Sequence, residues 1–317
     1  MTYDFLAVGD TVTDAFITLE DARVHCDVND EACAISMRWG DKIPYKALTV
    51  VPGVGNSANA AVAARRLGLK TGLVTDIGKD MFGKEIIERF AEEKLDTTYV
   101  REHDGIPTNY HFVLSYEAER TILVKHQKYP YEFPEECEPP KTLYFSSVGE
   151  GTENYHDTIA TYLEAHPDVY FAFQPGTFQM KLGTERLQRL YQRTNLFFAN
   201  KEEYRRILDS KETDVSKLLE AMRGLGPKTP VLTDGRDGAY ALVEGAQVHV
   251  PMFPDPAPPK ERTGAGDAFS STVATYMTMG MDIKDAMLRG TVNSAYVVQE
   301  IGAQAGLLSK EALENKL

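Results

Sequence analysis

The sequence predicts an α/β fold, a three-layer sandwich with a mostly parallel central sheet and a small β-sheet lid. Short apolar strands alternate with helical segments along most of the chain, which is typical of a parallel sheet covered by helices on both faces. Two stretches, at about 16–50 and 106–126, lack this alternation and contain short strand patterns instead. We expect a single domain over residues 1–317, with these two insertions forming the lid.

The expected strands are short apolar runs that end in Gly or in a polar residue. The first is Phe5–Gly9. The other strands of the main sheet are expected at 71–75, 143–146, 169–173, 196–199 and 230–233. Lid strands are expected near 16–24, 34–39, 46–51, 108–114 and 120–125, with turns at 27–30 and 116–119.

Helices are expected where apolar residues recur three or four positions apart. In segment 84–94, for example, Ile86, Ile87 and Phe90 form one apolar face. The same pattern predicts helices at 60–68, 155–165, 184–193, 202–208, 215–223 and 268–279. Because helices connect the parallel strands, the carboxyl ends of those strands should meet at one edge of the sheet.

Composition narrows the partners and the location. The formal net charge of −13 argues against nucleic acid and anionic membranes as partners. No stretch approaches the roughly 18 apolar residues of a membrane span, and the first residues lack the features of a signal peptide, so we expect a cytoplasmic protein. Cys26, Cys33 and Cys137 match neither a disulfide framework nor zinc spacing, and we expect reduced thiols.

The segment Thr263-Gly264-Ala265-Gly266-Asp267 opens a predicted helix after a Pro-rich loop. Small residues at a helix start expose backbone N–H groups, and the helix dipole adds partial positive charge, so the segment predicts a site for an anion, above all a phosphate. Asp267 has two interpretations. It can cap the helix, or it can take the proton of a group that attacks the phosphorus.

Further polar residues follow other predicted strands. Asn200 and Glu203 come after one strand, and Thr233 and Gly235 after the next. We expect them at the same sheet edge as segment 263–267, in one cleft. Taken alone, Asn200-x-x-Glu203 also fits a helix cap followed by an acidic first turn.

The first strand is followed by Asp10 and Asp14, either of which can form a turn or point toward a ligand. Farther on, Gly53-x-Gly55-x-x-Ala58 with Asp76 looks like a dinucleotide fingerprint, but Pro52 interrupts the strand and the unit does not begin the fold. In the other interpretation, Gly55 lets a ligand approach the backbone and Asn59 hydrogen-bonds it.

Together these stretches resemble the ribokinase family of carbohydrate kinases, also called the PfkB family, in motif order over nearly the whole chain. The most specific match is Thr263–Phe269, which corresponds to the C-terminal signature of that family. The resemblance implies a ribokinase-like fold and an ATP-dependent kinase. It implies that Asp267 is the catalytic base and that the N–H groups of Gly264, Ala265 and Gly266 hold the transferring phosphoryl group.

The resemblance also implies roles for the other motifs. Asn200 and Glu203 would help to place Mg²⁺ and the phosphates through water, with no direct protein ligand to the metal. Residues near the nucleotide would include Thr233, Gly235, Thr263 and Asn293. Asp14, Gly55 and Asn59 would hold sugar hydroxyl groups.

Two departures from the family pattern stand out. Val54 occupies a position where the family has one of two paired glycines, and its side chain leaves less room for a ligand to approach the backbone. The C-terminal signature begins Glu261-Arg262 where relatives often have Asp-Thr, and that Asp contributes to a monovalent-cation site in many members. Ile301–Gln304 resembles the segment beside that site. A cation such as K⁺ near Glu261 and Ala303 is therefore an open expectation.

The leading functional hypothesis is a kinase that phosphorylates a hydroxyl group of a small sugar. A nucleoside kinase would use lid aromatic residues to stack on a base, and the candidates are Trp39, Tyr45, Tyr110 and Phe112. A phosphosugar kinase would aim a cation at the substrate phosphate, and the candidates are Arg38, Arg101, Arg120 and Lys125. A non-catalytic binding protein has no need of Asp267. We further expect a homodimer formed through the free face of the lid.

Overall fold

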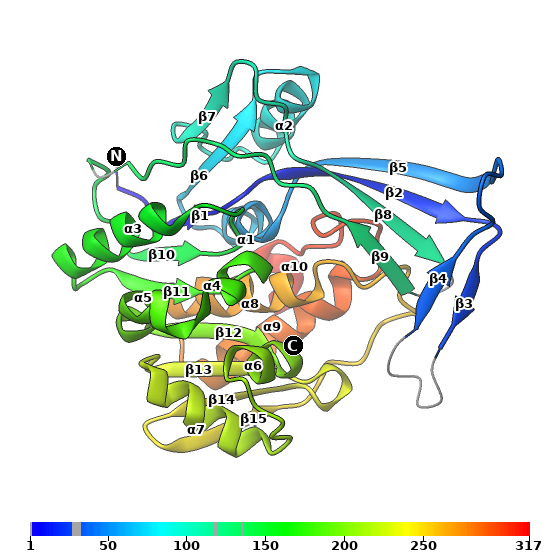
Figure 1. The fold of residues 1–317 in the computed structure, drawn as a ribbon. Coiled ribbons are helices and arrows are strands. Elements are labelled where there is room, and N and C mark those ends of the chain that lie inside the picture. The colour runs from blue at the N-terminus through cyan, green and yellow to red at the C-terminus, as the bar shows by residue number, and fades with distance from the viewer. Residues whose placement is uncertain (1, 27–32, 117–118, 135) are drawn as a thin grey trace.

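The computed structural model describes residues 2–26, 33–116, 119–134 and 136–317. Its central sheet has nine strands in the order β15-β14-β13-β12-β11-β10-β1-β6-β7 (Figure 1). Neighbouring strands are parallel except at β14 and β15, which form an antiparallel hairpin at one edge. The bounds are β1 Phe5–Val8, β6 Thr71–Gly78, β7 Val100–His103, β10 Thr142–Phe145, β11 Tyr170–Phe173, β12 Leu196–Asn200, β13 Thr229–Thr233, β14 Ala239–Val243 and β15 Ala246–Val250.

Helices cover both faces of this sheet, and each face has its own apolar core. Because side chains alternate along a strand, Phe197 and Phe198 of β12 belong to opposite cores. The helices are α1 Asn56–Arg66, α2 Met81–Glu92, α3 Glu153–Ala165, α4 Thr177–Arg186, α5 Gln188–Arg193, α6 Lys201–Ile207, α7 Val215–Leu225, α8 Ala265–Thr278, α9 Ile283–Val297 and α10 Lys310–Glu314, with a 3₁₀ turn η1 at Gly235–Asp237. The predicted fold class is confirmed. None of the helices in the described ranges is long and apolar enough to cross a bilayer.

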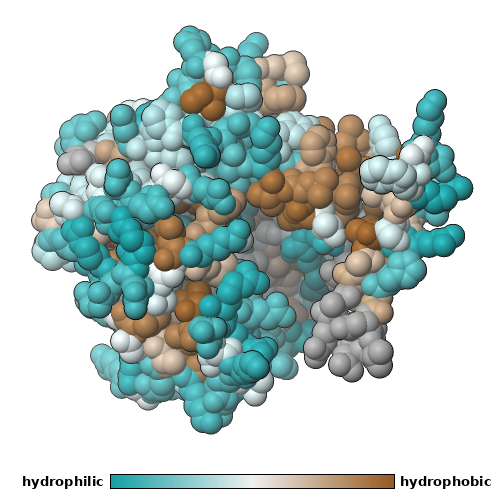
Figure 2. Space-filling model, in the orientation of Figure 1, coloured by the Kyte–Doolittle hydropathy of each residue, from teal (hydrophilic) through white to brown (hydrophobic). Residues whose placement is uncertain are grey.

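A second sheet, the lid, projects from the sheet edge that carries the carboxyl strand ends (Figure 1). Its strand order is β5-β2-β8-β9. The bounds are β2 Val12–Leu19, β5 Tyr45–Val54, β8 Tyr110–Tyr116 and β9 Glu119–Leu123. One cross-strand row consists of Val50, Ala15, Phe112 and Leu123. Apolar side chains gather on the lid in Figure 2, and Val50, Phe112 and Leu123 are among the exposed ones.

Several elements differ from the sequence-based expectation. Asp14 was expected in a turn and lies inside β2, because the lid strand begins at Val12 rather than near residue 16. The expected helix at 184–193 is divided at Leu187 between the end of α4 and α5, and Gly183 within α4 has a non-helical conformation. The sequence did not lead us to expect β7, the β14–β15 hairpin or α9. The predicted turns at 27–30 and 116–119 lie wholly or mostly outside the described residues.

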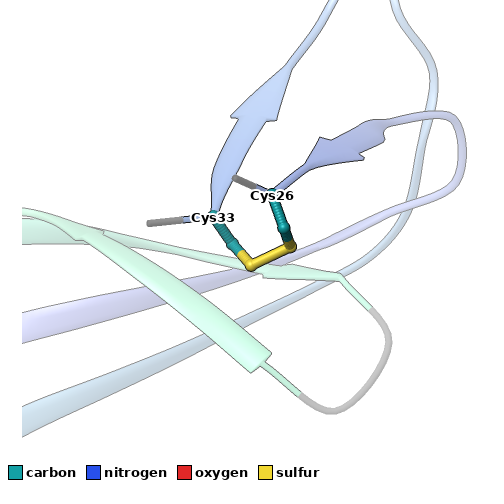
Figure 3. The surroundings of a disulfide bond; sticks show 2 residues. All are labelled: Cys26 and Cys33. Carbon is teal, nitrogen blue, oxygen red and sulfur yellow. A yellow bond between two sulfur atoms is a disulfide. The ribbon is translucent and has the colours of Figure 1, made fainter. Parts of the chain in front are cut away.

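The hairpin at the tip of the lid corrects the prediction for the cysteines. β3 (Arg23–His25) pairs with β4 (Ala34–Ser36), and His25 lies opposite Ala34. This register brings the next residues, Cys26 and Cys33, together, and they form a disulfide bond (Figure 3). The expectation of reduced thiols is therefore wrong for this pair. Cys137 is a buried free thiol.

Candidate active site

Two cavities meet at the N-terminal end of α8. The lid-side cavity, of about 650 Å³, lies between the lid and the sheet edge, and the C-terminal cavity, of about 430 Å³, lies beside η1 and α9. Thr233, Arg262 and Gly266 line both cavities. Asn200 lies opposite Thr233 in the β12–β13 register, so these strand ends share one edge as predicted. A group bound in either cavity can therefore reach the start of α8.

The start of α8 depends on two glycines with different surroundings. Gly264 has a positive φ of 82°, and a Cβ atom there would come within 2.4 Å of the Cβ atom of Ala303. A Cβ atom on Gly266 would meet only open space. The N–H groups of Gly264 and Gly266 have no partner among the described residues, and Ala265 makes only a long bond of 3.4 Å to Arg262 O. Free amides at a helix start are a site for an anion.

The carboxylate of Asp267 is held by three side-chain amides. Asn56 Nδ2 donates to Oδ1 at 2.9 Å, and Gln174 Nε2 donates to the same oxygen at 3.1 Å. Asn59 Nδ2 donates to Oδ2 at 2.8 Å. Gly264, not Asp267, occupies the N-cap position of α8. The capping interpretation of Asp267 is thus wrong, and its carboxylate faces the lid-side cavity, which it lines.

Two opposing effects act on the proton affinity of this carboxyl group. Burial raises the pKa of Asp267 above its ordinary value, and the nearby Asp14 charge raises it further. The amide donors of Asn59, Gln174 and Asn56 lower the pKa, but burial prevails. A carboxylate with a raised pKa is a stronger base than an exposed one and is matched better to proton transfer near neutral pH.

Asn200 and Glu203 form a helix cap and also lie in the cleft, so both interpretations of this sequence motif are correct. They form a capping box at α6, in which Asn200 Oδ1 accepts from Glu203 N and Glu203 Oε2 accepts from Asn200 N, each at 2.9 Å. Both residues also line the lid-side cavity. Burial raises the pKa of the Glu203 carboxyl. Asn200 Nδ2 and Glu203 Oε1 take no part in the capping box.

The residues predicted to hold the sugar line the lid-side cavity, but not in the same way. Asp14 Oδ1 is buried without a hydrogen-bond partner among the described residues, beside His111. Gly55 allows a close approach, since a Cβ atom there would lie 2.7 Å from Asp10 O. Asn59 also lines the cavity, and its amide donates to Asp267 while its carbonyl oxygen accepts from Gln304.

The region predicted to hold a monovalent cation contains buried oxygens without partners. Glu261 Oε1 accepts from Thr263 N at 2.9 Å, whereas Glu261 Oε2 and Thr263 Oγ1 are buried and unpaired within the described chain. Burial raises the pKa of the Glu261 carboxyl. Ala303 packs directly against Gly264. Oxygen donors of this kind suit a hard monovalent cation.

The prediction for Asn293 is not supported by its position. Asn293 is fully buried between α8 and α9, where its Nδ2 donates to Thr272 Oγ1 at 2.8 Å and its Oδ1 accepts from Leu308 N at 2.9 Å. It lines neither cavity, whereas Thr291 and Ser294 line the C-terminal one together with Gly235. The C-terminal stretch that contains Asn293 does line this cavity, but through Thr291 and Ser294 rather than through Asn293.

Most of the residues proposed to distinguish a nucleoside from a phosphosugar substrate lie outside the two cavities. The aromatic candidates Trp39, Tyr45, Tyr110 and Phe112 are all absent from the cavity linings. Arg38 pairs with Asp41 and Arg101 with Asp76, and Lys125 is exposed. Arg120 does line the lid-side cavity, and its Nε is buried with no partner in the described chain. Lys181 of α4 lines the same cavity.

Sequence reasoning missed three residues of this site, Asn56, Gln174 and His126. Asn56 precedes Asn59 by three positions and so shares its helix face, a spacing that could have identified it. Gln174 follows the strand β11 at the edge where the other polar residues gather, which is the same kind of signal. His126 lines the lid-side cavity beside Asp10, which the sequence offered as a turn residue or a ligand contact, and only the folded lid brings the two together. Across the described ranges, no cluster of three or more His, Cys, Asp or Glu side chains could bind a metal directly.

Comparisons with known proteins agree with this geometry. The model of the pfkB family carbohydrate kinases matches residues 40–310. An ATP-dependent 6-phosphofructokinase of Thermoanaerobacterium thermosaccharolyticum is 24% identical over 314 residues, which is 95% of this chain and 89% of that protein. A ribokinase of Bacillus subtilis is 25% identical, over 88% of this chain and 92% of that protein.

A solved structure shares the fold. Arabidopsis thaliana ribokinase in complex with ribose and ATP superposes with a TM-score of 0.82 at 18% identity, covering 99% of this chain and 98% of that chain. Nucleoside kinases are also among the relatives. The chain belongs to the pfkB family of carbohydrate kinases and is an ATP-dependent kinase of sugars or nucleosides.

Proposed function

We propose that this protein transfers the γ-phosphoryl group of ATP to a hydroxyl group of a small sugar, with Asp267 as the general base. The acceptor binds in the lid-side cavity, and the nucleotide binds in the C-terminal cavity beside Gly235 and Ser294. The phosphoryl group crosses where the cavities meet, over Gly266. Asp267 takes the proton of the attacking hydroxyl as its oxygen bonds to phosphorus and ADP leaves.

The anion hole rests on the free amides at the start of α8. The N–H groups of Gly264 and Gly266 have no competing acceptor among the described residues, and Ala265 has only a weak one. They would stabilise the charge on the transferring group, helped by the helix dipole. Mg²⁺, held through water near Asn200 and Glu203, would neutralise the phosphates of the nucleotide in this acidic protein. The unpaired oxygens of Glu261 and Thr263 fit a supporting K⁺ ion.

The observation that carries the proposal is the position of Asp267, held by three amides at the junction of two cavities. The test is Asp267→Asn in purified protein, with D-ribose and D-fructose as acceptors. We expect turnover to fall by at least about a hundredfold, as is typical when a general base is lost. Binding of a non-hydrolysable ATP analogue with Mg²⁺ should persist. Retained turnover in the variant would refute the mechanism.

A phosphorylated sugar is a second candidate acceptor, favoured by one observation. Arg120 and Lys181 line the lid-side cavity. Arg120 lies near enough to Glu261 to lower the pKa of that carboxyl, against the burial that raises it, and Lys181 lies over the Phe178 ring. These two cations give an anionic ligand contacts of opposite charge in a cavity that Asp10, Asp14 and Glu203 also line. If this is the acceptor, Arg120→Gln should reduce kcat/KM for fructose 6-phosphate much more than for fructose. An equal effect on both sugars would exclude a phosphate contact.

A further inference from the structure

A chain of hydrogen bonds behind the lid-side cavity is not used by the proposed phosphoryl transfer. Tyr131 Oη donates to Asp10 Oδ1 at 2.8 Å, and His126 Nδ1 bonds to the other oxygen of Asp10. Asp10 is buried in the loop after β1, and His126 follows β9 of the lid. Asp10 and His126 both line the cavity. The chain therefore connects the core to a side chain that faces the acceptor.

This arrangement determines which nitrogen of His126 carries the proton. A carboxylate only accepts hydrogen bonds, so Tyr131 must donate to Asp10 and Nδ1 of His126 must carry a hydrogen. Burial, followed by the charge of Asp10, raises the pKa of the Tyr131 phenol well above its ordinary value, so it remains a donor. In the neutral ring, Nε2 is then a hydrogen-bond acceptor. Within the described chain, Nε2 has no partner.

Packing holds the His126 ring in place. Phe178 meets it edge to face with ring centroids 5.3 Å apart, and His111 lies at the same distance. Gly149 lets the network close, because a Cβ atom there would come within 3.0 Å of Tyr131 Oη and 3.2 Å of His126 Cβ. A ring fixed by a buried carboxylate and by two neighbouring rings presents Nε2 in one direction.

We propose that His126 selects the acceptor by accepting a hydrogen bond through Nε2 from one of its hydroxyl groups. Asp10 and Tyr131 are positioning residues that set the tautomer. The inference rests on the proposed function for the acceptor itself. Asp14 Oδ1, which has no hydrogen-bond partner in the described chain and lies 3.5 Å from His111 Nδ1, is a second acceptor on this wall. The wall therefore recognises hydroxyl donors, and it disfavours a fluorine or an ether oxygen, which can only accept.

The tautomer can be measured without turnover. Two-bond ¹H–¹⁵N spectra of protein labelled with ¹⁵N-histidine distinguish the two neutral forms, and His126→Gln identifies the resonances of His126. We expect the Nδ1–H form in the unmodified protein. In Asp10→Asn, the amide can donate to Nδ1, so the ring should change to the Nε2–H form. An Nε2–H ring in the unmodified protein would overturn the proposal, as would an unchanged tautomer in Asp10→Asn.

Selectivity is the second readout. Using whichever of D-ribose or D-fructose is turned over, kcat/KM is compared between that sugar and its monodeoxyfluoro congeners. At one ring position we expect the hydroxyl to be preferred by about tenfold, and His126→Ala should abolish that preference. In Asp10→Asn, the preference in kcat/KM should shift from the hydroxyl toward the fluoro congener. His166→Gln, beside Tyr162 and outside both cavities, is the matched control.

The outcomes separate the inference from the function on which it rests. If His126→Ala lowers kcat/KM equally for every congener, His126 has only a structural role and the inference is wrong. If Asp267→Asn keeps its turnover, the proposed mechanism fails, while the tautomer result still decides whether Asp10 sets the acceptor nitrogen of His126.

Discussion

Asn59 Nδ2 donates to Asp267 Oδ2 at 2.8 Å, joining the first helix of the fold to the proposed base across 208 residues of sequence. This bond lowers the pKa of Asp267, against the burial that raises it. In Asn59→Ala the donor is lost, so the pKa should rise further. A base must be deprotonated to act, so the acidic limb of the kcat–pH profile should move to higher pH. At neutral pH we expect kcat to fall on the order of tenfold.

The control for this prediction is Asn154→Ala, at an exposed position of α3, which should leave the kcat–pH profile unchanged. An unshifted acidic limb in Asn59→Ala, measured with the same acceptor, would show that Asn59 does not tune the base.

Glu203→Gln should stabilise the protein at neutral pH while lowering its activity. Burial raises the pKa of Glu203 in the folded state, so its contribution to stability is present at low pH and is lost as pH rises through the folded pKa. Gln keeps the N3 side of the capping box without the buried charge. We expect a gain of up to about 1 kcal/mol at pH 7, measured by urea unfolding.

The gain from Glu203→Gln should vanish at low pH, where the carboxyl is protonated. Glu202→Gln, at an exposed position of the same helical turn, should give no such gain. A stability increase that is constant with pH would rule out removal of charge as the cause.

Gly264→Ala and Gly266→Ala should separate folding from catalysis. The change at position 264 forces a positive φ on alanine and places its methyl group against Ala303, so we expect a loss of about 2–3 kcal/mol in the free energy of unfolding. The methyl group added at position 266 would enter open space where the cavities meet, so stability should hold while turnover falls about a hundredfold or more. Chemical denaturation and steady-state kinetics on both variants provide the comparison. Equal effects on stability would contradict it.

The lid should mediate a homodimer. Val50, Phe112 and Leu123 form one cross-strand row with Ala15, and their exposed fractions are 42%, 45% and 52%. Replacing Val50 and Phe112 by Lys would place charge in that contact, and we expect a monomer by analytical ultracentrifugation. Met81→Lys, on an exposed site of α2, is the control and should remain a dimer. A monomeric unmodified protein at micromolar concentration would exclude this interface.

The cysteines should react as one thiol and one disulfide. Alkylation of unfolded, unreduced protein should modify only Cys137, because the β3–β4 register joins Cys26 to Cys33. Reduction should release two further thiols, detected by mass spectrometry. Disulfides persist mainly in oxidising compartments, so the same measurement on protein quenched with alkylating reagent inside cells also tests the expected cytoplasmic location. Modification of all the cysteines without reduction would show that the bond does not form.

Much of the fold could be predicted from sequence because its signals are local. The strands around Leu143 and Leu196 are continuous apolar runs, as expected for strands buried on both faces. The β14–β15 hairpin was missed although β14 is a mostly buried apolar run, because β15 at the sheet edge is largely exposed and carries a weaker pattern. The break between α4 and α5 and the lid register depend on packing between distant segments, which a single sequence does not show.

The site divides in the same way. Asp267, Asn200 and Thr233 could be placed in one cleft because strand ends in a parallel sheet share an edge. Asn56 and Gln174 carried local signals of a place at this site, but their contacts with Asp267 could not be predicted, since they approach it from segments 211 and 93 residues away. His126 gave no signal of its own, because its meaning depends on Asp10, to which the fold brings it across 116 residues.

The C-terminal cavity has a consequence for how this kinase can change over evolutionary time. In the described part of the chain, every residue that lines it lies between Thr233 and Val298, whereas the lid-side cavity also draws on β2, α1, β8 and β9. Substitutions, or exchange of the first half of the chain, can thus change the lid-side cavity, where we propose that the acceptor binds, without altering the proposed nucleotide pocket. The residues of the two cavities can therefore change largely independently of each other. Among the described residues, only Thr233, Arg262 and Gly266 line both cavities and are constrained by both.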